Sequence, residues 1–341
     1  MSKRGKAGQR LAALWARADV LLILLTLVLA VLLMVRFGNV PAEAEFEQPT
    51  PLNTAPAVVV QEEPQQPIPE QGRPVRFLMY NVQNYFVAGE ASRSRFVSRA
   101  KSEKARKAVA AAIAEARPEI VGLIEIGGKL ALQDLQERLG EHGVDYRHSY
   151  VLERRGEDRA LALLSMHPIE RNDSVADKGL FGDHKRKMLR GILDVTVGLD
   201  DGRRFRIVGV HLKSRVAVNA DAADSLRRRE VRTVADYLHI LQTAQPDIPL
   251  LVFGDWNDGP ADGAMGILGK LSGLTRVKAE DSRGQCWTIY YDNGKGYFVF
   301  DQIFVNSVMQ KRLGKRSKSG IVDSKHTNTA SDHRPVWCDL R

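Results

Sequence analysis

Three short polar clusters follow one another in the second half of the chain, and each contains residue types that handle phosphate esters. They are His211-Leu212-Lys213, Asp255-Trp256-Asn257-Asp258 and Ser331-Asp332-His333. The first two clusters each follow an apolar, β-branched run, which is the pattern of a buried strand. Polar side chains that leave a sheet at neighbouring strand ends are commonly brought together in a site. Carboxylates, an amide and two imidazoles at one place outline a site for metal-assisted phosphoryl transfer.

Two further strand-like runs lie upstream and also end in polar residues. Residues 75–80 run into Asn81, and residues 119–124 run into Glu125. With these two pieces the chain resembles the endonuclease/exonuclease/phosphatase superfamily over residues 75–341, because the motifs stand in the same order and at similar spacing. The resemblance implies an α/β fold, a four-layer sandwich in which two packed, mostly antiparallel sheets are flanked by helices.

The resemblance also implies roles for individual residues. Asn81, Glu125 and Asp332 match the ligands of a divalent cation, which we expect to be Mg²⁺, with Mn²⁺ and Ca²⁺ as alternatives. Magnesium needs only one or two carboxylates because it keeps several waters. His333 matches the catalytic histidine, and Asp301 matches the carboxylate that would fix its tautomer.

The remaining candidates are expected around the phosphate. Asp255 resembles a residue that orients or deprotonates the attacking water, or binds a second cation. Asn257 resembles its companion, an amide that donates to a phosphate oxygen without adding charge. His211 matches the second histidine, with Asp158 as its expected carboxylate partner. Arg190 would either contact phosphate or form a structural salt bridge.

The order of the elements is compatible with the fold that the resemblance implies. Amphipathic helices are predicted over residues 99–116 and 222–241. Four arginines of the second helix are expected mostly to face solvent: Arg227, Arg228, Arg229 and Arg232. Strand-like runs occur near residues 159–165, 191–197, 286–291 and 298–305.

Cys286 and Cys338 would either pair in an oxidising compartment or remain two buried thiols, and the sequence leaves both open.

The first 74 residues differ in composition from the rest. Residues 1–40 contain a basic start and an apolar run from Val20 to Val35, which favours an uncleaved membrane anchor. A signal peptide cleaved after Ala44 is the alternative. Residues 41–74 hold eight of the fourteen prolines and six glutamates, which predicts an extended linker. Residues 75–341 would then form a catalytic domain on the exported side, either periplasmic or extracellular.

The charge of residues 75–341 narrows the substrate class. This part has 43 lysines and arginines against 34 acidic residues, and such an excess favours a polyanion, either DNA or RNA, or an anionic phospholipid head group. We therefore expect an extracytoplasmic nuclease, with a phospholipid or small-molecule phosphodiesterase as the alternative. An inactive binding module is a remote third reading, because every expected site residue is present. The sequence indicates no protein partner, and we expect a monomeric catalytic domain.

Overall fold

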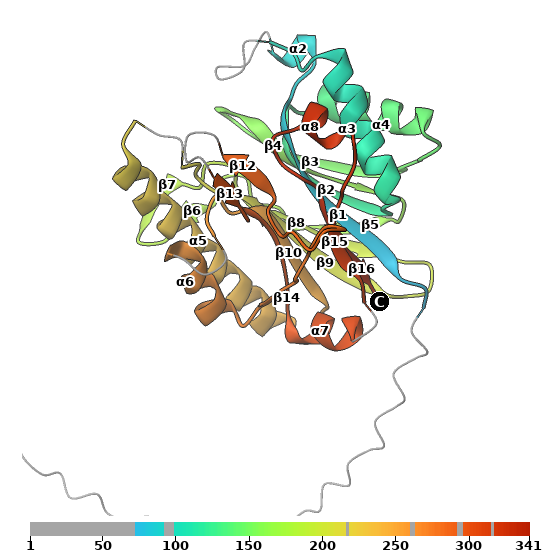
Figure 1. Cartoon of the computed structure of the whole chain (residues 1–341). Coiled ribbons are helices and arrows are strands. Elements are labelled where there is room, and N and C mark those ends of the chain that lie inside the picture. Colours follow the sequence, from blue (N-terminus) through green and yellow to red (C-terminus); the bar gives the residue numbers. More distant parts are fainter. Residues whose placement is uncertain (1–71, 92–98, 216–217, 260–262, 292–295, 315–316) are drawn as a thin grey trace, which may run out of the picture. The chain divides into compact units, whose positions relative to one another are not determined.

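The computed structural model describes residues 72–91, 99–215, 218–259, 263–291, 296–314 and 317–341 (Figure 1). The expected membrane anchor lies outside these described residues, as does all of the expected linker up to residue 71. Within the described part of the chain, no helix is both long enough and apolar enough to cross a membrane.

The first of two six-stranded sheets contains the N-terminal and C-terminal strands of the domain. Its strand order is β15-β16-β1-β2-β4-β3. Strands β1 and β2 run parallel, and the other four neighbouring pairs are antiparallel. The strands are β1 (Val75–Tyr85), β2 (Ile120–Ile126), β3 (His148–Arg154), β4 (Glu157–Ser165), β15 (Ser319–Ile321) and β16 (Val336–Leu340).

The second sheet repeats this arrangement. Its strand order is β11-β14-β10-β9-β8-β5. Here β9 and β10 run parallel, and the other four pairs are antiparallel. The strands are β5 (Ile169–Asn172), β8 (Leu193–Gly198), β9 (Arg204–His211), β10 (Leu250–Asp255), β11 (Thr275–Arg276) and β14 (Asp301–Val305).

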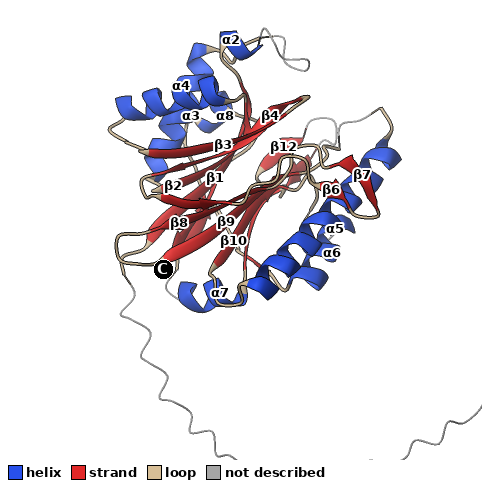
Figure 2. Ribbon diagram, turned by 180° about the vertical axis from the view of Figure 1, so that it is seen from behind, coloured by secondary structure: helices blue, strands red, loops and turns tan. Residues whose placement is uncertain are grey.

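Helices cover the outer face of each sheet, as Figure 2 shows. The first sheet is covered by α3 (Glu103–Ala116), α4 (Lys129–Glu141) and α8 (Thr327–Ala330), and the second by α5 (Ala220–Ala244) and α6 (Gly263–Ser272). Shorter elements complete the described chain: the helices α2 (Ala88–Ala91) and α7 (Ser307–Leu313), a hairpin of β6 (Gly179–Leu180) with β7 (Asp183–Lys187), and a hairpin of β12 (Ile289–Tyr291) with β13 (Gly296–Phe298).

Alternation along the strands builds three apolar layers. In β1, Phe77 and Met79 face the second sheet, whereas Leu78 and Tyr80 face the helices. Successive side chains of a strand point to opposite faces, so a strand buried on both faces reads as a continuous apolar run. This is why the strands were visible in the sequence. The predicted sandwich of two mostly antiparallel sheets flanked by helices is confirmed.

One aromatic ring occupies the space between the sheets where two glycines face it. The Phe253 ring of β10 packs against Phe77 with ring centroids 5.4 Å apart. A Cβ added at Gly122 of β2 or at Gly209 of β9 would come within 2.5 Å of the Cζ atom of this ring. The two sheets can therefore approach each other here only because these two positions lack side chains.

The structure corrects the expected strand over residues 298–305. Strand β13 ends at Phe298, and β14 begins only at Asp301. The hydroxyl oxygen of Thr288 accepts hydrogen bonds from the backbone N–H groups of both Phe300 and Asp301, at 3.1 and 3.0 Å. These N–H groups have a side-chain partner instead of a strand partner, so the chain passes here from the hairpin into the second sheet. Within the expected strand 286–291, the regular part likewise begins only at Ile289.

Three of the four arginines of α5 are exposed, as expected, and Arg227 is the exception. It is buried because its guanidinium donates to the carbonyl oxygen of Lys213 at 3.3 Å and to Asp224 at 2.7 Å. The cysteines are both free: Cys338 is buried in the sheet interface, and Cys286 is exposed.

Candidate active site

Residues from both sheets meet at a cavity of about 380 Å³. The regular pairing of β1 with β2 ends at Asn81, close to Glu125, and β9 and β10 end together at His211 and Asp255. The parallel pair of each sheet thus delivers its carboxyl ends to the same place. Of the predicted site residues, those that line the cavity are Glu125, Arg190, His211, Asp255, Asn257, Asp332 and His333.

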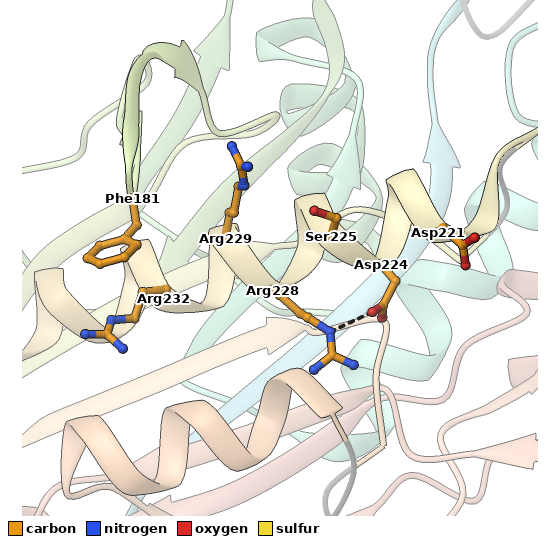
Figure 3. Close-up of a pocket in the computed structure, with 7 residues that line it drawn as sticks. All are labelled: Phe181, Asp221, Asp224, Ser225, Arg228, Arg229 and Arg232. Atoms are coloured by element: carbon orange, nitrogen blue, oxygen red, sulfur yellow. Dashed lines mark hydrogen bonds and ion pairs between the residues drawn. The ribbon is translucent and has the colours of Figure 1, made fainter. Parts of the chain in front are cut away.

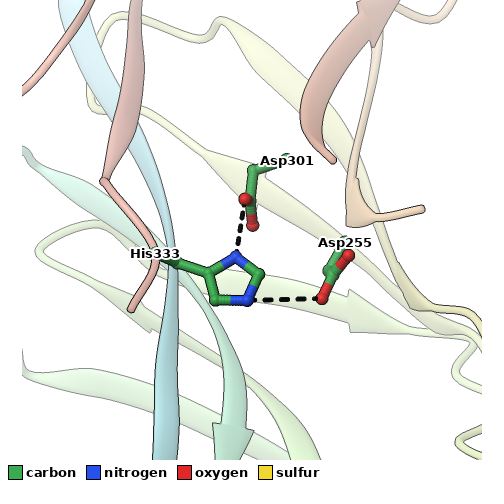
Figure 4. Close-up of side chains that lie close together, drawn as sticks. All are labelled: Asp255, Asp301 and His333. Atoms are coloured by element: carbon green, nitrogen blue, oxygen red, sulfur yellow. Dashed lines mark hydrogen bonds and ion pairs between the residues drawn. The ribbon is translucent and has the colours of Figure 1, made fainter. Parts of the chain in front are cut away.

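Strand register aligns three of these side chains. Asp255 is the Cα partner of His211 on one side and of Asp301 on the other, so β9, β10 and β14 present them in one row. His333 reaches this row from the loop before β16 (Figure 4). Its Nδ1 lies 2.7 Å from Oδ2 of Asp301, and its Nε2 lies 3.9 Å from Oδ2 of Asp255. The expected contact between His333 and Asp301 is therefore present.

The His333 ring is held in its charged form. Burial opposes that charge, but attraction to Asp301 and the hydrogen bond to it raise the pKa of His333 to about 10, with Asp255 and Asp332 acting in the same direction. At neutral pH the buried imidazolium can therefore donate a hydrogen bond from Nε2 toward the cavity.

Asp255 is shifted toward its neutral form. Burial raises the pKa of Asp255 to about 7; charged His333 opposes this shift, and the nearby carboxylates of Asp301 and Glu125 act with burial. Its oxygens accept hydrogen bonds from Nδ2 of Asn81 and from the backbone N–H of Asn257, each at 3.0 Å. A carboxylate with a pKa near neutrality can take up a proton from water and release it again.

His211 does not have the partner that the sequence suggested. Its Nδ1 is buried and has no hydrogen-bond partner among the described residues, whereas its Nε2 lies 3.7 Å from both Glu125 and Asp255. Asp158 instead lines a different cavity, with Glu90 and Lys129. Neighbouring residues of a strand point to opposite faces, and in β4 it is Arg159 that lines the active-site cavity. The predicted pair of Asp158 and His211 is therefore not formed.

Three cations border the cavity around His211: Arg159, Arg190 and Lys213. Burial lowers the pKa of His211 well below its usual value, and the positive charges of Arg190 and Arg159 lower it further, so this imidazole is neutral. Arg190 also lies 3.4 Å from half-buried Glu157, which agrees with the salt bridge foreseen as its alternative role. The sequence had singled out neither Arg159 nor the side chain of Lys213. The signal for Arg159 was its position one residue after Asp158.

Four residues of this cavity have left-handed backbone conformations. The φ angles of Gln83, Asn84, Glu125 and Asn257 lie between 45° and 65°. Such angles cost about 1–3 kcal/mol each in residues other than glycine, and they cluster at functional sites. At Glu125 the conformation accompanies a hydrogen bond from the backbone N–H of Asn84 to the carboxylate at 3.0 Å.

The donor atoms on the Glu125 side of the cavity fit a divalent cation. Glu125 and Asp332 line the cavity, and the Asp332 side chain is 46% exposed, so its oxygens are accessible to water. Asn81 is buried beside these residues and does not line the cavity; its Nδ2 donates to Asp255, and its Oδ1 accepts from the backbone N–H of Gln83 at 3.0 Å. Hard oxygens with access to water are what Mg²⁺ prefers. Asp255, Asp301 and His333 also each bring one atom within 4.8 Å of the others, a spacing that can hold a cation or a shared proton.

The loop that carries His333 is anchored at each end. The hydroxyl of Ser331 donates to the carbonyl oxygen of Asn81 at 2.7 Å and accepts from the backbone N–H of His333 at 3.1 Å. The Arg334 guanidinium donates to buried Asp281 at 2.8 Å and lies 4.2 Å from the centre of the Trp287 ring. His333 is therefore held between two buried contacts.

Comparison with known proteins agrees with this geometry. The Endonuclease/Exonuclease/phosphatase family matches residues 80–333. The catalytic domain of human Nocturnin with bound sulfate is similar, with a TM-score of 0.55 and 17% identity over 79% of this chain and 94% of that one. TDP2 from Caenorhabditis elegans is similar with a TM-score of 0.54 and 15% identity, over 79% of this chain and 75% of that one. Beta toxin from Staphylococcus aureus is similar with a TM-score of 0.55 and 14% identity, over 77% of this chain and 99% of that one. No curated protein sequence matches the chain.

At these identities the solved structures show the fold, while the family match spans the cavity residues from Glu125 to His333. The carboxylates, the paired histidine and the cationic border lie together at one cavity, as a phosphoester hydrolase requires. The chain therefore belongs to the Endonuclease/Exonuclease/phosphatase family, whose members are divalent-metal-dependent hydrolases of phosphoester bonds.

Proposed function

We propose that this protein is a divalent-metal-dependent phosphodiesterase that cleaves nucleic acid outside the cytoplasm. The observation that carries the proposal is the cationic border of Arg159, Arg190 and Lys213 beside the His333–Asp301 pair. A polynucleotide has phosphates on both sides of the scissile one, and this border would attract them. The positively charged choline of a phosphocholine lipid would be repelled at the same place.

The residues of the cavity can carry out hydrolysis between them. Asp255, with its pKa near 7, can take the proton of the attacking water. Charged His333 can stabilise the negative charge that develops on phosphate, and Asp301 keeps it oriented. Neutral His211 and the amide of Asn257 can bond phosphate oxygens or the leaving group without adding charge.

Glu125 and Asp332, with Asn81, are the residues that would hold the cation, which we propose to be Mg²⁺. When bound, such an ion neutralises phosphate charge and strengthens the electrophilicity of phosphorus. The chain's own contribution is to fix the carboxylate of Glu125 through the Asn84 N–H, and to leave Asp332 open to water.

A phospholipid phosphodiesterase is the second candidate, and one observation favours it. Tyr290 and Tyr297 of the β12–β13 hairpin are 45% and 63% exposed, with ring centroids 5.0 Å apart. Ile289 of the same hairpin lines the cavity and forms a β-bridge with His333, so the hairpin lies beside the cavity. Exposed aromatic side chains suit the polar–apolar boundary of a membrane as well as the face of a base.

The location proposed for the enzyme rests on the sequence alone. We propose that residues 1–40 anchor it in a membrane and that residues 41–74 hold the catalytic domain on the exported side. Protease added to intact spheroplasts should then degrade the catalytic domain. Survival of the domain until the cells are lysed would contradict an exported location.

The activity can be tested with the full chain in detergent micelles. It would be offered plasmid DNA, RNA and phosphatidylcholine vesicles, each with Mg²⁺ and with EDTA, beside the His333→Ala variant. We expect nicking of plasmid or cutting of RNA that EDTA and the substitution both abolish. Turnover of the lipid with intact nucleic acid would establish the second candidate instead. No turnover by the parent would favour a binding module.

A further inference from the structure

Helix α5 has one face that is fixed to the loops of the active site. Glu230 is fully buried, and its carboxylate accepts from the backbone N–H of Lys213 at 2.7 Å and from that of Leu189 at 3.0 Å. Arg227 donates to the carbonyl oxygen of the same Lys213. Since Lys213 lines the cavity and Leu189 precedes Arg190, the first half of α5 lies behind the cationic border.

The other face of the same helical turns is exposed and basic. The side chains of Arg228, Arg229 and Arg232 are 48%, 44% and 41% exposed, and they line a hollow of about 390 Å³. Figure 3 shows Phe181, from the turn between β6 and β7, over Arg232 at the edge of this hollow. The Arg232 guanidinium lies 4.6 Å from the centre of the Phe181 ring, which is itself 43% exposed.

Each of these arginines has an acidic neighbour. Arg228 lies 2.6 Å from Asp224 and Arg232 lies 3.4 Å from Asp236, while Arg229 is 3.9 Å from an aspartate of β7. Exposed ion pairs of this kind contribute only about 0–1 kcal/mol, so a phosphate can replace the aspartate at little cost. Positive charge also prevails locally, because β7 adds three exposed cations: Lys185, Arg186 and Lys187.

We propose that the surface formed by Phe181, Arg228, Arg229 and Arg232, here called the α5 arginine surface, binds the nucleic-acid strand that flanks the scissile phosphate. The proposal rests on the nuclease function proposed above. Guanidinium groups bind phosphates, and an exposed ring bordered by a guanidinium offers a stacking face for a base. An anionic membrane is disfavoured, because Phe181 is the one large apolar side chain that lines the hollow in the described part of the chain.

Continuity with the active site supports this assignment. Arg227 contacts the loop of Lys213, and Arg232 lies five residues further along α5. At 1.5 Å per residue this is about 8 Å along the helix axis. The α5 arginine surface is on the opposite face of the helix, so a strand held in the cavity by its scissile phosphate would have to pass around α5 to reach it, which several further nucleotides can do and a dinucleotide cannot.

The test compares two variants of the full chain that lose the same charge. One carries Arg228→Gln, Arg229→Gln and Arg232→Gln. The control carries the same change at three arginines elsewhere that are also exposed and paired with an acid. These are Arg147 before β3, Arg171 in β5 and Arg204 at the start of β9, whose side chains are 78%, 59% and 62% exposed.

Binding of a labelled single-stranded oligonucleotide of roughly 30 residues would be measured in EDTA, so that the result does not depend on cleavage. We expect the first variant to bind about tenfold or more weakly than parent and control, because it loses phosphate contacts. The slope of the logarithm of the binding constant against the logarithm of salt concentration should also become shallower by about 0.7 for each lost contact. With Mg²⁺, KM for the long strand should rise about as much, while kcat/KM for a dinucleotide stays within about twofold of the parent.

Three results would overturn the α5 arginine surface. Unchanged binding of the oligonucleotide by the first variant is one, and an equal loss by the control is another. The third is a loss of binding to phosphatidylglycerol vesicles while oligonucleotide binding remains, which would assign the surface to a membrane. Failure of the parent to cut any nucleic acid, with arginine-dependent binding intact, would instead refute the nuclease function alone.

Discussion

Asn81 and Asp255 join the two sheets through one buried hydrogen bond, in which Nδ2 of the amide donates to Oδ2 of the carboxylate at 3.0 Å. Asn81 belongs to β1 of the first sheet, and Asp255 ends β10 of the second. The carboxylate proposed to receive the proton of water is thus positioned by both halves of the sandwich. The backbone N–H of Asn257 holds its other oxygen, so its orientation is fixed on both sides.

Asp301 and His333 should act as one unit. We expect Asp301→Asn and His333→Ala each to lower kcat/KM by about 10²- to 10⁴-fold, because a misoriented or absent imidazole no longer stabilises the charge on phosphate. The double variant should be little worse than either single one. His239→Ala is the control, since that imidazole is exposed on α5. Additive losses in the double variant would contradict the pairing.

Glu230 should position the cationic border without touching substrate. In Glu230→Gln one of the two backbone N–H groups loses its acceptor, because an amide has a single oxygen, and a buried unsatisfied donor costs about 1–3 kcal/mol. We expect a lower melting temperature and a higher KM for nucleic acid, with kcat less affected. Glu137→Gln, on the exposed face of α4, is the matched control.

A double-mutant cycle separates positioning by Glu230 from general destabilisation. If Glu230 acts through Lys213, the change in KM caused by Glu230→Gln should largely vanish in a Lys213→Ala background. An equal rise in KM in both backgrounds, measured well below the melting temperature, would show that the carboxylate has only a structural role.

Gly122 should be among the least replaceable residues of the sheet interface. In Gly122→Ala the new methyl group would lie 2.5 Å from the Phe253 ring, and overpacking of this kind costs about 1–3 kcal/mol. Gly140→Ala on α4 is the comparison, because no atom lies within 4 Å of its added Cβ and alanine favours a helix by roughly 0.5–1 kcal/mol. Urea unfolding of both variants measures the difference, and equal midpoints would refute the packing argument.

Asp281 should make stability depend on pH in the acidic range. Burial opposes its charge, but hydrogen bonds from the backbone of Gln285 and from Arg334 hold its pKa well below the usual range. Its pKa in the folded state is thus lower than the value of about 3.9 expected in the unfolded chain. The stabilisation is complete above that value and is lost as the pH falls through the folded pKa.

The measurement is urea unfolding of the parent and of Asp281→Asn at several pH values. The parent should be the more stable protein at pH about 6. The difference between the two midpoints should begin to shrink below pH about 4, as the unfolded carboxyl takes up a proton, and should keep shrinking as the pH falls towards the folded pKa. A constant difference across this range would mean that the Asp281 charge does not contribute.

Metal should stabilise the folded chain as well as activate it. Mg²⁺ at about 100 times its dissociation constant should add about 2.7 kcal/mol to the free energy of unfolding, and EDTA should remove this gain. Glu125→Gln should abolish both the metal-dependent rise in melting temperature and the activity. A rise that persists in this variant would place the cation elsewhere, for example at Asp255, Asp301 and His333.

Much of the fold was visible in the sequence because its strands are buried on both faces. Runs such as residues 120–124 are apolar without interruption, and their polar ends mark where each strand leaves the sheet. Helix α4 and the edge strand β3 were not anticipated. The burial of Arg227 was missed because a guanidinium on a helix gives no local sign that a carbonyl from another loop will receive it.

The site was predictable where a motif fixes both residue and position, as for His333 with Asp301. It was not predictable where the partner depends on which face of a strand a side chain takes. Asp158 and Arg159 are neighbours in sequence, yet only Arg159 lines the cavity. Contacts supplied from behind the cavity, such as those of Glu230, carry no motif at all.

The bond between Asn81 and Asp255 also means that neither sheet contains a complete site. Catalytic geometry tolerates little error, and a misplacement of about 1 Å can cost 10²-fold in rate. The rate of catalysis in this protein should therefore depend closely on the distance between the two sheets. A methyl group added at Gly122, which would push against the Phe253 ring between the sheets, should therefore lower the rate of catalysis as well as the stability.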